Sequence, residues 1–260
     1  MDKKVALYCQ LGGATDMAEF SILGKYGALE NSGLDPEEID LTFILWKTPQ
    51  HTYEWLKDHN LKYVEMEYDE GKGFLWNLYK GWNLGYEVGY AVSDLICPIA
   101  TDHAFYKDWL KNLIDNNHSN RITCCKLIEP GTLPTLHSHR NFGLTLDSEF
   151  DGDAFEYFCK KLSKDKVVID DINGLFHENN GVGGSYGHRL DAMPFVCPRS
   201  VWERFGPMLQ TVNQFGTTGD TDFFDRCRTG GVEIAKALNA ISYHCGGVET
   251  RKNQERGIYT

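Results

Sequence analysis

The stretch of sequence that decides the fold is Asp94-Leu-Ile-Cys-Pro-Ile-Ala-Thr-Asp-His-Ala-Phe-Tyr-Lys-Asp-Trp-Leu110. Residues 95–99 have the apolar run of a buried strand, and the segment that carries Trp109 and Leu110 is typical of an amphipathic helix. In α/β proteins, a strand that ends in an acid places that acid at the sheet edge where ligands bind. Asp102 is therefore the first candidate for a functional residue. An equally open alternative is that Asp102 only caps the following helix.

The composition indicates a folded, acidic, soluble protein. The chain has 260 residues, 42% of them hydrophobic, which is enough for one large α/β domain or two small ones. Its formal charge of −11 repels phosphate backbones, so we expect no broad nucleic-acid binding. Eight cysteines without C-x-x-C spacing indicate reduced core thiols, and hence the cytoplasm. No apolar run is long enough for a signal peptide or a transmembrane segment, so we expect at most peripheral membrane contact.

Strand and helix patterns alternate along the chain, as in βαβ units. The sequence contains no internal repeat, so the simplest organisation is one α/β domain with a mostly parallel sheet. Strands are predicted at residues 5–9, 39–46, 61–67, 95–99, 121–128, 192–197, 232–238 and 240–244. Helices are predicted around residues 18–29, 53–57, 75–82, 109–113, 149–162, 199–205 and 217–228.

Two of these helices carry candidate site residues. In the helix at 75–82, an apolar stripe is expected to pack on the sheet, so that Asn77 points away from it and can contact a ligand. The members of this stripe are Leu75, Leu78, Tyr79 and Trp82. An exposed helical asparagine without a function is the commoner case. In the helix at 217–228, Asp220 falls in the first turn, where the helix dipole favours a carboxylate. It shares a face with apolar residues. An acid on the buried side of a helix is unusual unless it has a partner, and this placement favours a functional site.

A glycine-rich loop at residues 178–187 has the glycine density of a phosphate-binding loop but lacks the Gly-Lys-Ser/Thr ending. We expect a loop that borders an acceptor site, with Asn180 and Gly183 as its contacts. An ordinary flexible connection has comparable weight.

Three motifs, in this order, resemble those of the family 2 glycosyltransferases and of the wider group of nucleotide-sugar-dependent transferases with the GT-A fold. Residues 71–77 resemble the Gly-x-x-x-Ala-x-Asn helix, residues 99–102 the strand that ends in the DxD acid, and residues 219–226 the Glu-Asp motif that ends in Arg. Residues 243–246, Tyr-His-Cys-Gly, stand where many members place a metal-binding histidine.

The resemblance covers residues 5–247 and implies a single Rossmann-like GT-A domain over residues 1–247, with a mixed, mostly parallel central sheet flanked by helices. Residues 1–128 would then form the nucleotide-sugar-binding half and residues 129–247 the acceptor-binding half, and residues 248–260 a flexible tail.

The same resemblance implies a metal-dependent glycosyltransferase that moves a sugar from a nucleotide diphosphate sugar to a hydroxyl of a glycan or other acceptor. Asp102 and His244 would hold Mn²⁺ or Mg²⁺, and the imidazole favours Mn²⁺. A core histidine at a strand end is the alternative for His244. For an inverting transfer, Asp220 is the candidate general base and Asp222 the second; in a retaining enzyme Asp220 would orient the acceptor. The expected donor-binding residues are Gln10, Gly12, Trp46, Lys72, Asn77, Thr101 and Asp102. The expected acceptor-binding residues are Asn180, Gly183 and Gly219.

This chain departs from the family pattern at three places. Ala100 replaces the first acid of DxD, and Gly219 replaces the Glu of Glu-Asp. The second strand ends in Trp46-Lys-Thr-Pro49 instead of the acids that hold the nucleobase, so base recognition does not carry over, and stacking of Trp46 on a base is a guess.

Two other functions stay open. A sugar-phosphate nucleotidyltransferase should begin with a Gly-rich loop followed by an Arg and a Lys, and residues 10–16 lack both. A catalytically inactive GT-A domain that binds nucleotide or glycan is favoured by Ala100.

Overall fold

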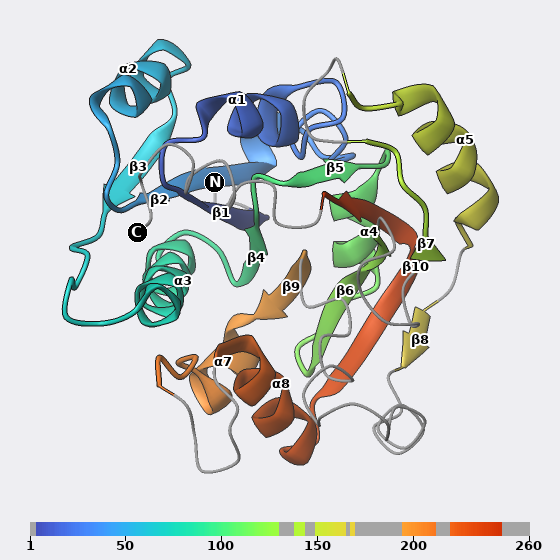
Figure 1. Cartoon of the computed structure of the whole chain (residues 1–260). Helices are drawn as coiled ribbons and strands as arrows, with labels where there is room; N and C mark the ends of the chain where they lie inside the picture. The colour runs from blue at the N-terminus through green and yellow to red at the C-terminus, as the bar shows by residue number, and fades with distance from the viewer. Residues whose placement is uncertain are drawn as a thin grey trace, which may run out of the picture.

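One mixed sheet of ten strands runs through the molecule in the computed structural model, which describes residues 4–129, 138–143, 149–164, 167–169, 194–211 and 219–245 (Figure 1). The strands are β1 (Val5–Leu11), β2 (Ile39–Leu45), β3 (Lys62–Glu65), β4 (Leu95–Ile99), β5 (His103–Phe105), β6 (Arg121–Glu129), β7 (Ser138–His139), β8 (Val167–Ile169), β9 (Phe195–Pro198) and β10 (Glu233–His244). They are ordered β3-β2-β1-β4-β9-β6-β10-β5, with β7 beside β6 and β8 beside β10. The predicted α/β class is confirmed.

The strand directions bring several strand ends to one edge. Strands β1 to β4 run parallel, whereas β9 runs antiparallel to both β4 and β6, and β10 is parallel to β6. Strands β6 and β10 therefore point the same way as β4. The carboxyl ends of β1, β2, β4 and β10 meet at the edge where open α/β sheets bind ligands.

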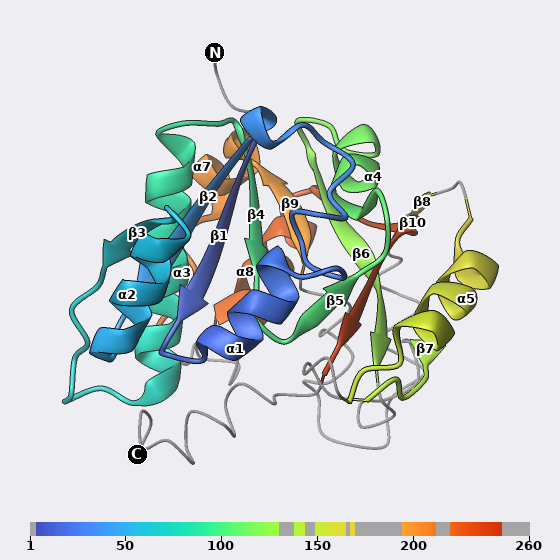
Figure 2. The same ribbon diagram turned by 90° about the horizontal axis from the view of Figure 1, so that it is seen from above.

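Helices cover both faces of the sheet. The described helices are α1 (Thr15–Ala18), α2 (Gln50–Asp58), α3 (Phe74–Tyr90), α4 (Trp109–Asp115), α5 (Gly152–Leu162), α7 (Arg199–Phe205) and α8 (Gly219–Thr229), with a π-helical turn at Glu19–Leu23 and a 3-10 turn at Pro36–Glu38. Figure 2 shows α1 and α2 in front of the sheet and α3, α7 and α8 behind it. Each face has its own apolar core, with Trp109 and Leu56 in one and Trp82, Tyr86 and Phe223 in the other.

Most predicted elements are present, and three differ. The helix expected around residues 18–29 ends after the π-helical turn at Leu23, and residues 103–105 add a strand, β5, that the sequence did not suggest. The two strands expected at 232–238 and 240–244 are one strand, β10, whose pairing with β6 shifts register between Ala237 and Ile241. At such a bulge the alternation of the strand is interrupted, so one strand was predicted as two.

Glycines share with Trp82 the face of α3 that packs on the sheet. The predicted stripe is confirmed for Trp82, which is buried, and is wrong for Leu75. Leu75 is 54% exposed, while Gly81, Gly85 and Gly89 are buried and recur at every fourth residue. A Cβ on Gly81 would lie 2.3 Å from Gln10 Oε1, and one on Gly85 would lie 2.3 Å from the Tyr8 ring. Because these residues have no side chains, the helix approaches β1 closely, and its contact surface includes backbone atoms that the predicted stripe did not suggest.

Substitution Gly85→Ala is therefore expected to lower the free energy of unfolding by about 1–3 kcal/mol, the usual cost of overpacking a core. The added methyl group would enter the buried Tyr8 ring, and the higher helix propensity of alanine offsets only part of that cost. Urea unfolding measures the change. Gly73→Ala is the matched control, because nothing lies within 4 Å of its Cβ, and equal losses in both variants would contradict the packing argument.

The structure also describes the cysteines and the lengths of the helices. All eight cysteines are buried and keep their thiols, and none forms a disulfide. Within the described segments, no helix combines the length and the apolar character that crossing a bilayer requires.

Candidate active site

Asp102 lies at the carboxyl edge of the sheet, three residues beyond β4, and its side chain is almost entirely buried. Strand β5 follows it directly, and α4 begins only at Trp109, after Asp108. Asp102 therefore does not cap that helix, and the alternative prediction of a capping role is wrong. Its carbonyl oxygen accepts a hydrogen bond from the Cys245 N–H at 2.9 Å, so the end of β10 is fixed beside it.

Two imidazoles surround the Asp102 carboxylate. His244 Nε2 lies 3.1 Å from Asp102 Oδ2, and His103 Nδ1 lies 3.2 Å from Asp102 Oδ1. The two rings stack with centroids 4.9 Å apart because His103 and His244 are opposite each other on the antiparallel strands β5 and β10. Residues 142 positions apart in the chain, Asp102 and His244, thus share one polar cluster.

Electrostatics keep this carboxylate ionised. Burial by itself would raise the pKa of Asp102, but the charge and hydrogen bonds of His244 and His103 outweigh it and hold the pKa well below its usual range. The cluster therefore places an ionised carboxylate directly beside two imidazole rings.

These two donors fit a divalent cation that is shared with a ligand. With bonds of about 2.1 Å, adjacent ligands of an octahedral ion stand about 3.0 Å apart, close to the observed separation of Asp102 Oδ2 and His244 Nε2. Across the residues that the structure describes, no group of three or more His, Cys, Asp or Glu is arranged to hold an ion. The protein would supply two donors, and phosphate oxygens and water the remainder.

Thr101 contributes to the same edge mainly through its backbone. Its carbonyl oxygen accepts a hydrogen bond from Ser21 Oγ at 2.5 Å, which ties the end of β4 to the π-helical turn after α1. Its own hydroxyl is buried and has no hydrogen-bond partner within the described ranges. The donor-binding role expected for Thr101 stays a prediction.

Gln10 and Trp46, both expected to bind the donor, contact each other at the ends of β1 and β2. The Trp46 indole N–H donates to Gln10 Oε1 at 2.8 Å, and Gln10 Nε2 donates to the Leu78 carbonyl of α3 at 2.9 Å. Trp46 is only 3% exposed and stacks on Tyr68, with centroids 5.3 Å apart. The guess that Trp46 stacks on a base is therefore wrong, because its indole is buried and Tyr68 covers one face.

Asn77 organises the loop before α3 from within the core. Its side chain is fully buried; Oδ1 accepts the Asp69 N–H at 2.8 Å, and Nδ2 donates to the carbonyls of Asp69, Lys72 and Gly73 at 3.0–3.4 Å. The expectation that Asn77 points outward to a ligand is wrong, because the loop backbone occupies its amide. Lys72 is exposed on this loop and Gly12 is buried after β1, and their donor-binding roles stay predictions.

Helix α8 presents Asp220 and Asp222 in different surroundings. Asp220 is half-buried and accepts hydrogen bonds from Tyr79 Oη at 3.0 Å and from the Thr221 N–H at 2.9 Å, both at Oδ1. Asp222 is 5% exposed, and Arg226 Nε donates to its Oδ2 at 2.7 Å. Asp222 is thus engaged in an ion pair along its own helix, which leaves Asp220 as the better candidate for a base.

Two solved structures match the fold of this chain over nearly its whole length. TarS 1-349 from S. aureus aligns with 98% of this chain and 64% of its own length, at 12% identity and a TM-score of 0.58. GalNAc-T7 with UDP, GalNAc and Mn²⁺ aligns with 94% of this chain and 44% of its own length, at 8% identity and a TM-score of 0.54. The chain has the GT-A fold.

The resemblance to GT-A glycosyltransferases is thus confirmed at the level of the fold. No protein-family model and no curated protein matches the chain. The chain spans less than two thirds of the length of either matched structure.

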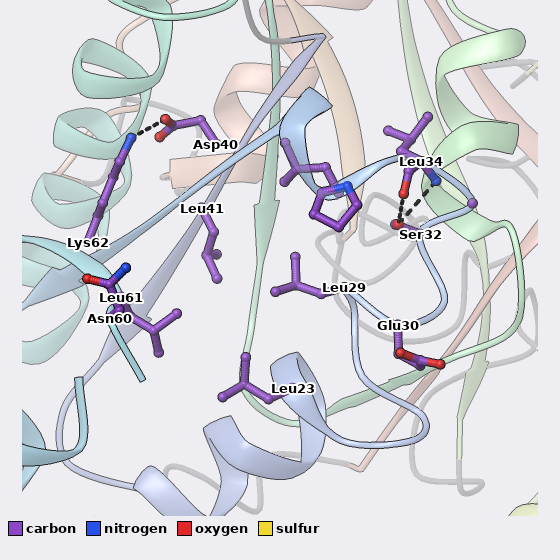
Figure 3. Close-up of a pocket in the computed structure, with 13 residues that line it drawn as sticks. Leu23, Leu29, Glu30, Ser32, Leu34, Asp40, Leu41, Asn60, Leu61 and Lys62 are labelled. Atoms are coloured by element: carbon purple, nitrogen blue, oxygen red, sulfur yellow. Dashed lines mark hydrogen bonds and ion pairs between the residues drawn. The ribbon is translucent and has the colours of Figure 1, made fainter. Parts of the chain in front are cut away.

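A pocket of about 560 Å³ lies at the other end of the GT-A sheet (Figure 3). Its walls include Ile39 and Leu41 at the start of β2 and Lys62 at the start of β3. Figure 3 shows leucine side chains around it and an ion pair between Lys62 and Asp40 at its rim. It opens at the amino ends of the parallel strands, so it is separate from the Asp102 cluster.

Some expected acceptor residues cannot be placed on the GT-A fold. Asn180 and Gly183 lie outside the described residues. Gly219 is described and packs against the Tyr79 ring. Its acceptor-binding role stays a prediction.

Sequence reasoning passed over Tyr79 as a site residue. It was predicted as a member of the apolar stripe of this helix, and nothing local distinguishes it from a core tyrosine. The signal that could have found it is Gly219, a glycine where the GT-A family pattern has an acid.

Removing the Asn77 side chain tests the loop that precedes α3. Asn77→Ala is expected to lower the free energy of unfolding by about 1–3 kcal/mol, because it leaves buried backbone groups without partners. Hydrogen exchange at the Asp69 amide should accelerate, since that N–H loses its acceptor. Asn116→Ala, which removes one bond within its own helix region, is the control. An unchanged exchange rate at Asp69 would contradict the loop-clamping role.

Proposed function

We propose that the protein is a glycosyltransferase that moves a sugar from a nucleoside diphosphate sugar to a hydroxyl group of a glycan or other acceptor. The observation that carries this proposal is the pairing of Asp102 and His244 at the carboxyl edge of a GT-A sheet, with Asp220 presented from α8. In this proposal residues 1–128 bind the donor and residues 129–247 the acceptor.

Asp220 is the proposed general base of an inverting transfer. As the acceptor oxygen bonds to the anomeric carbon of the sugar, its proton passes to the Asp220 carboxylate. The bond from that carbon to the phosphate oxygen breaks, and its electron pair leaves with the nucleoside diphosphate. Proton removal by a positioned carboxylate is typically worth ~10²–10⁴-fold in rate.

Asp102 and His244 are the proposed ligands of Mn²⁺ or Mg²⁺. When bound, such an ion neutralises the negative charge that develops on the diphosphate. The protein's own part is to keep the Asp102 carboxylate ionised and fixed: His103 and His244 flank its two oxygens, and the Cys245 N–H holds its carbonyl. GalNAc-T7, one of the matched structures, contains UDP, GalNAc and Mn²⁺, which supports this choice of donor class and ion.

A thermal-shift panel of nucleoside diphosphate sugars, each with and without Mn²⁺, tests the proposal. We expect at least one donor to raise the melting temperature in a Mn²⁺-dependent way, and the same donor to be turned over, at least by slow hydrolysis. His244→Ala should abolish the Mn²⁺ dependence. His118→Ala is the control, because that histidine is exposed and contacts Glu233 at the start of β10, at the opposite end of that strand from His244. Stabilisation without metal and without turnover would instead support an inactive binding domain.

A further inference from the structure

Tyr79 connects the two halves of the molecule at the candidate base. Its hydroxyl group, on the second turn of α3, donates to Asp220 Oδ1 at 3.0 Å across 141 residues of sequence. The preceding residue, Leu78, accepts the hydrogen bond of Gln10 near the end of β1. The contact therefore places Asp220 at the carboxyl edge of the sheet.

Gly219 makes room for this contact. A Cβ on Gly219 would lie 1.8 Å from Cζ of Tyr79, and the glycine has φ +59°, in the left-handed region that favours glycine. A side chain at position 219 and the Tyr79 ring at this place exclude each other. The departure from the Glu-Asp pattern is thus matched by a tyrosine that occupies the vacated space.

Asn83 holds the same region from one turn further along α3. It is buried, its Nδ2 donates to the Met208 carbonyl, and its Oδ1 accepts the Met208 N–H, both at 2.9 Å. The next residue, Leu209, accepts the Gly219 N–H at 2.9 Å. Residues Tyr79 and Asn83 lie four positions apart and so on one face of α3, and together they fix the start of α8.

The two donors to Asp220 use the same oxygen. Tyr79 Oη and the Thr221 N–H both bond to Oδ1, and within the described parts of the chain Oδ2 accepts no hydrogen bond. Two donors fix the orientation of the carboxylate plane.

We propose that Tyr79 is the positioning residue of the Asp220 base: it anchors Oδ1 so that Oδ2 is aimed at the acceptor hydroxyl. This inference rests on the proposed function. A misdirected catalytic group can cost up to about 10²-fold, so the hydroxyl group of Tyr79 should matter in the transfer step itself.

Tyr79→Phe removes the hydroxyl group and keeps the ring that packs on Gly219. We expect kcat for transfer to fall about 10-fold or more while KM for the donor stays the same. Tyr90→Phe is the matched control: it lies on the same helix and loses one hydrogen bond, to the Cys197 carbonyl, far along α3 from Asp220. Its kcat should stay at the wild-type value. Equal kcat values in Tyr79→Phe and wild type would overturn the proposal.

Combining Tyr79→Phe with Asp220→Asn separates positioning from general stability. If Tyr79 acts through Asp220, the double variant should have the same kcat as Asp220→Asn alone. A further fall in kcat, equal to the product of the two single losses, would overturn the inference. A wild-type protein without any transfer activity would overturn the proposed function, and this inference with it. An active wild type that is indifferent to Tyr79→Phe overturns this inference alone.

Discussion

Asp220→Asn is expected to lower kcat for sugar transfer by about 10²–10⁴-fold with little change in KM for the donor. The amide keeps the size of the carboxylate and can still accept the hydrogen bonds of Tyr79 and Thr221, but it cannot take up the proton of the acceptor. Steady-state kinetics with the donor identified by thermal shift measure the loss.

The control for this prediction lies two residues away. Asp222→Asn should weaken the ion pair with Arg226 and so reduce the melting temperature, yet keep most of the transfer activity. The opposite result, a large loss of kcat in Asp222→Asn and near-normal rates in Asp220→Asn, would exchange the two roles. That outcome would leave the fold assignment intact and contradict the inference about Tyr79.

Asp102→Asn is expected to reduce kcat/KM by at least about 10²–10³-fold, the range seen when one preorganised charge-stabilising group is lost. The substitution removes the negative charge between His103 and His244 but leaves the size of the side chain unchanged. It should also abolish the Mn²⁺-dependent part of the thermal shift, which is a readout independent of turnover.

Asp94→Asn controls for the loss of a carboxylate near the same strand. Asp94 lies at the other end of β4, is exposed and pairs with Arg199 at 2.9 Å, and a pair of this kind contributes at most about 1 kcal/mol. Its activity and Mn²⁺ response should match those of the wild type. Normal transfer by Asp102→Asn would remove Asp102 from the mechanism.

The Asp102 stretch shows how far local pattern reaches. An unbroken apolar run followed by an acid correctly predicted β4 and a residue at the sheet edge, because a buried strand has a strong local signature. The same stretch gave no sign of strand β5. Three residues, His103 to Phe105, form a strand only because β10 pairs with them, and that partner lies more than 130 residues further along the chain.

Helix α3 shows the opposite error. Trp82 of the predicted stripe is buried, but Leu75 is exposed. Glycines lie against β1 on the sheet-facing side, and Asn77 is buried beneath a loop. Which side of a helix faces the core depends on how closely it approaches the sheet, and the sequence of the helix does not encode that distance. The burial of Trp46 was likewise not visible in the sequence around it, because Tyr68, which covers one face of its indole, comes from another segment of the chain.

The sequence by itself determined the α/β class, the order of most elements, and the candidates Asp102 and Asp220, because strands, helices and acids at their ends have signatures within a few residues. The candidate His244 came from the resemblance to the GT-A family. Only the tertiary structure decided that Asp102 meets His244, that Asp222 is occupied by Arg226, and that Tyr79 reaches Asp220 over a glycine. The decisive contacts of Asp102 and Asp220 join residues more than 140 positions apart. Such contacts arise from strand order and helix packing, which are properties of the whole chain.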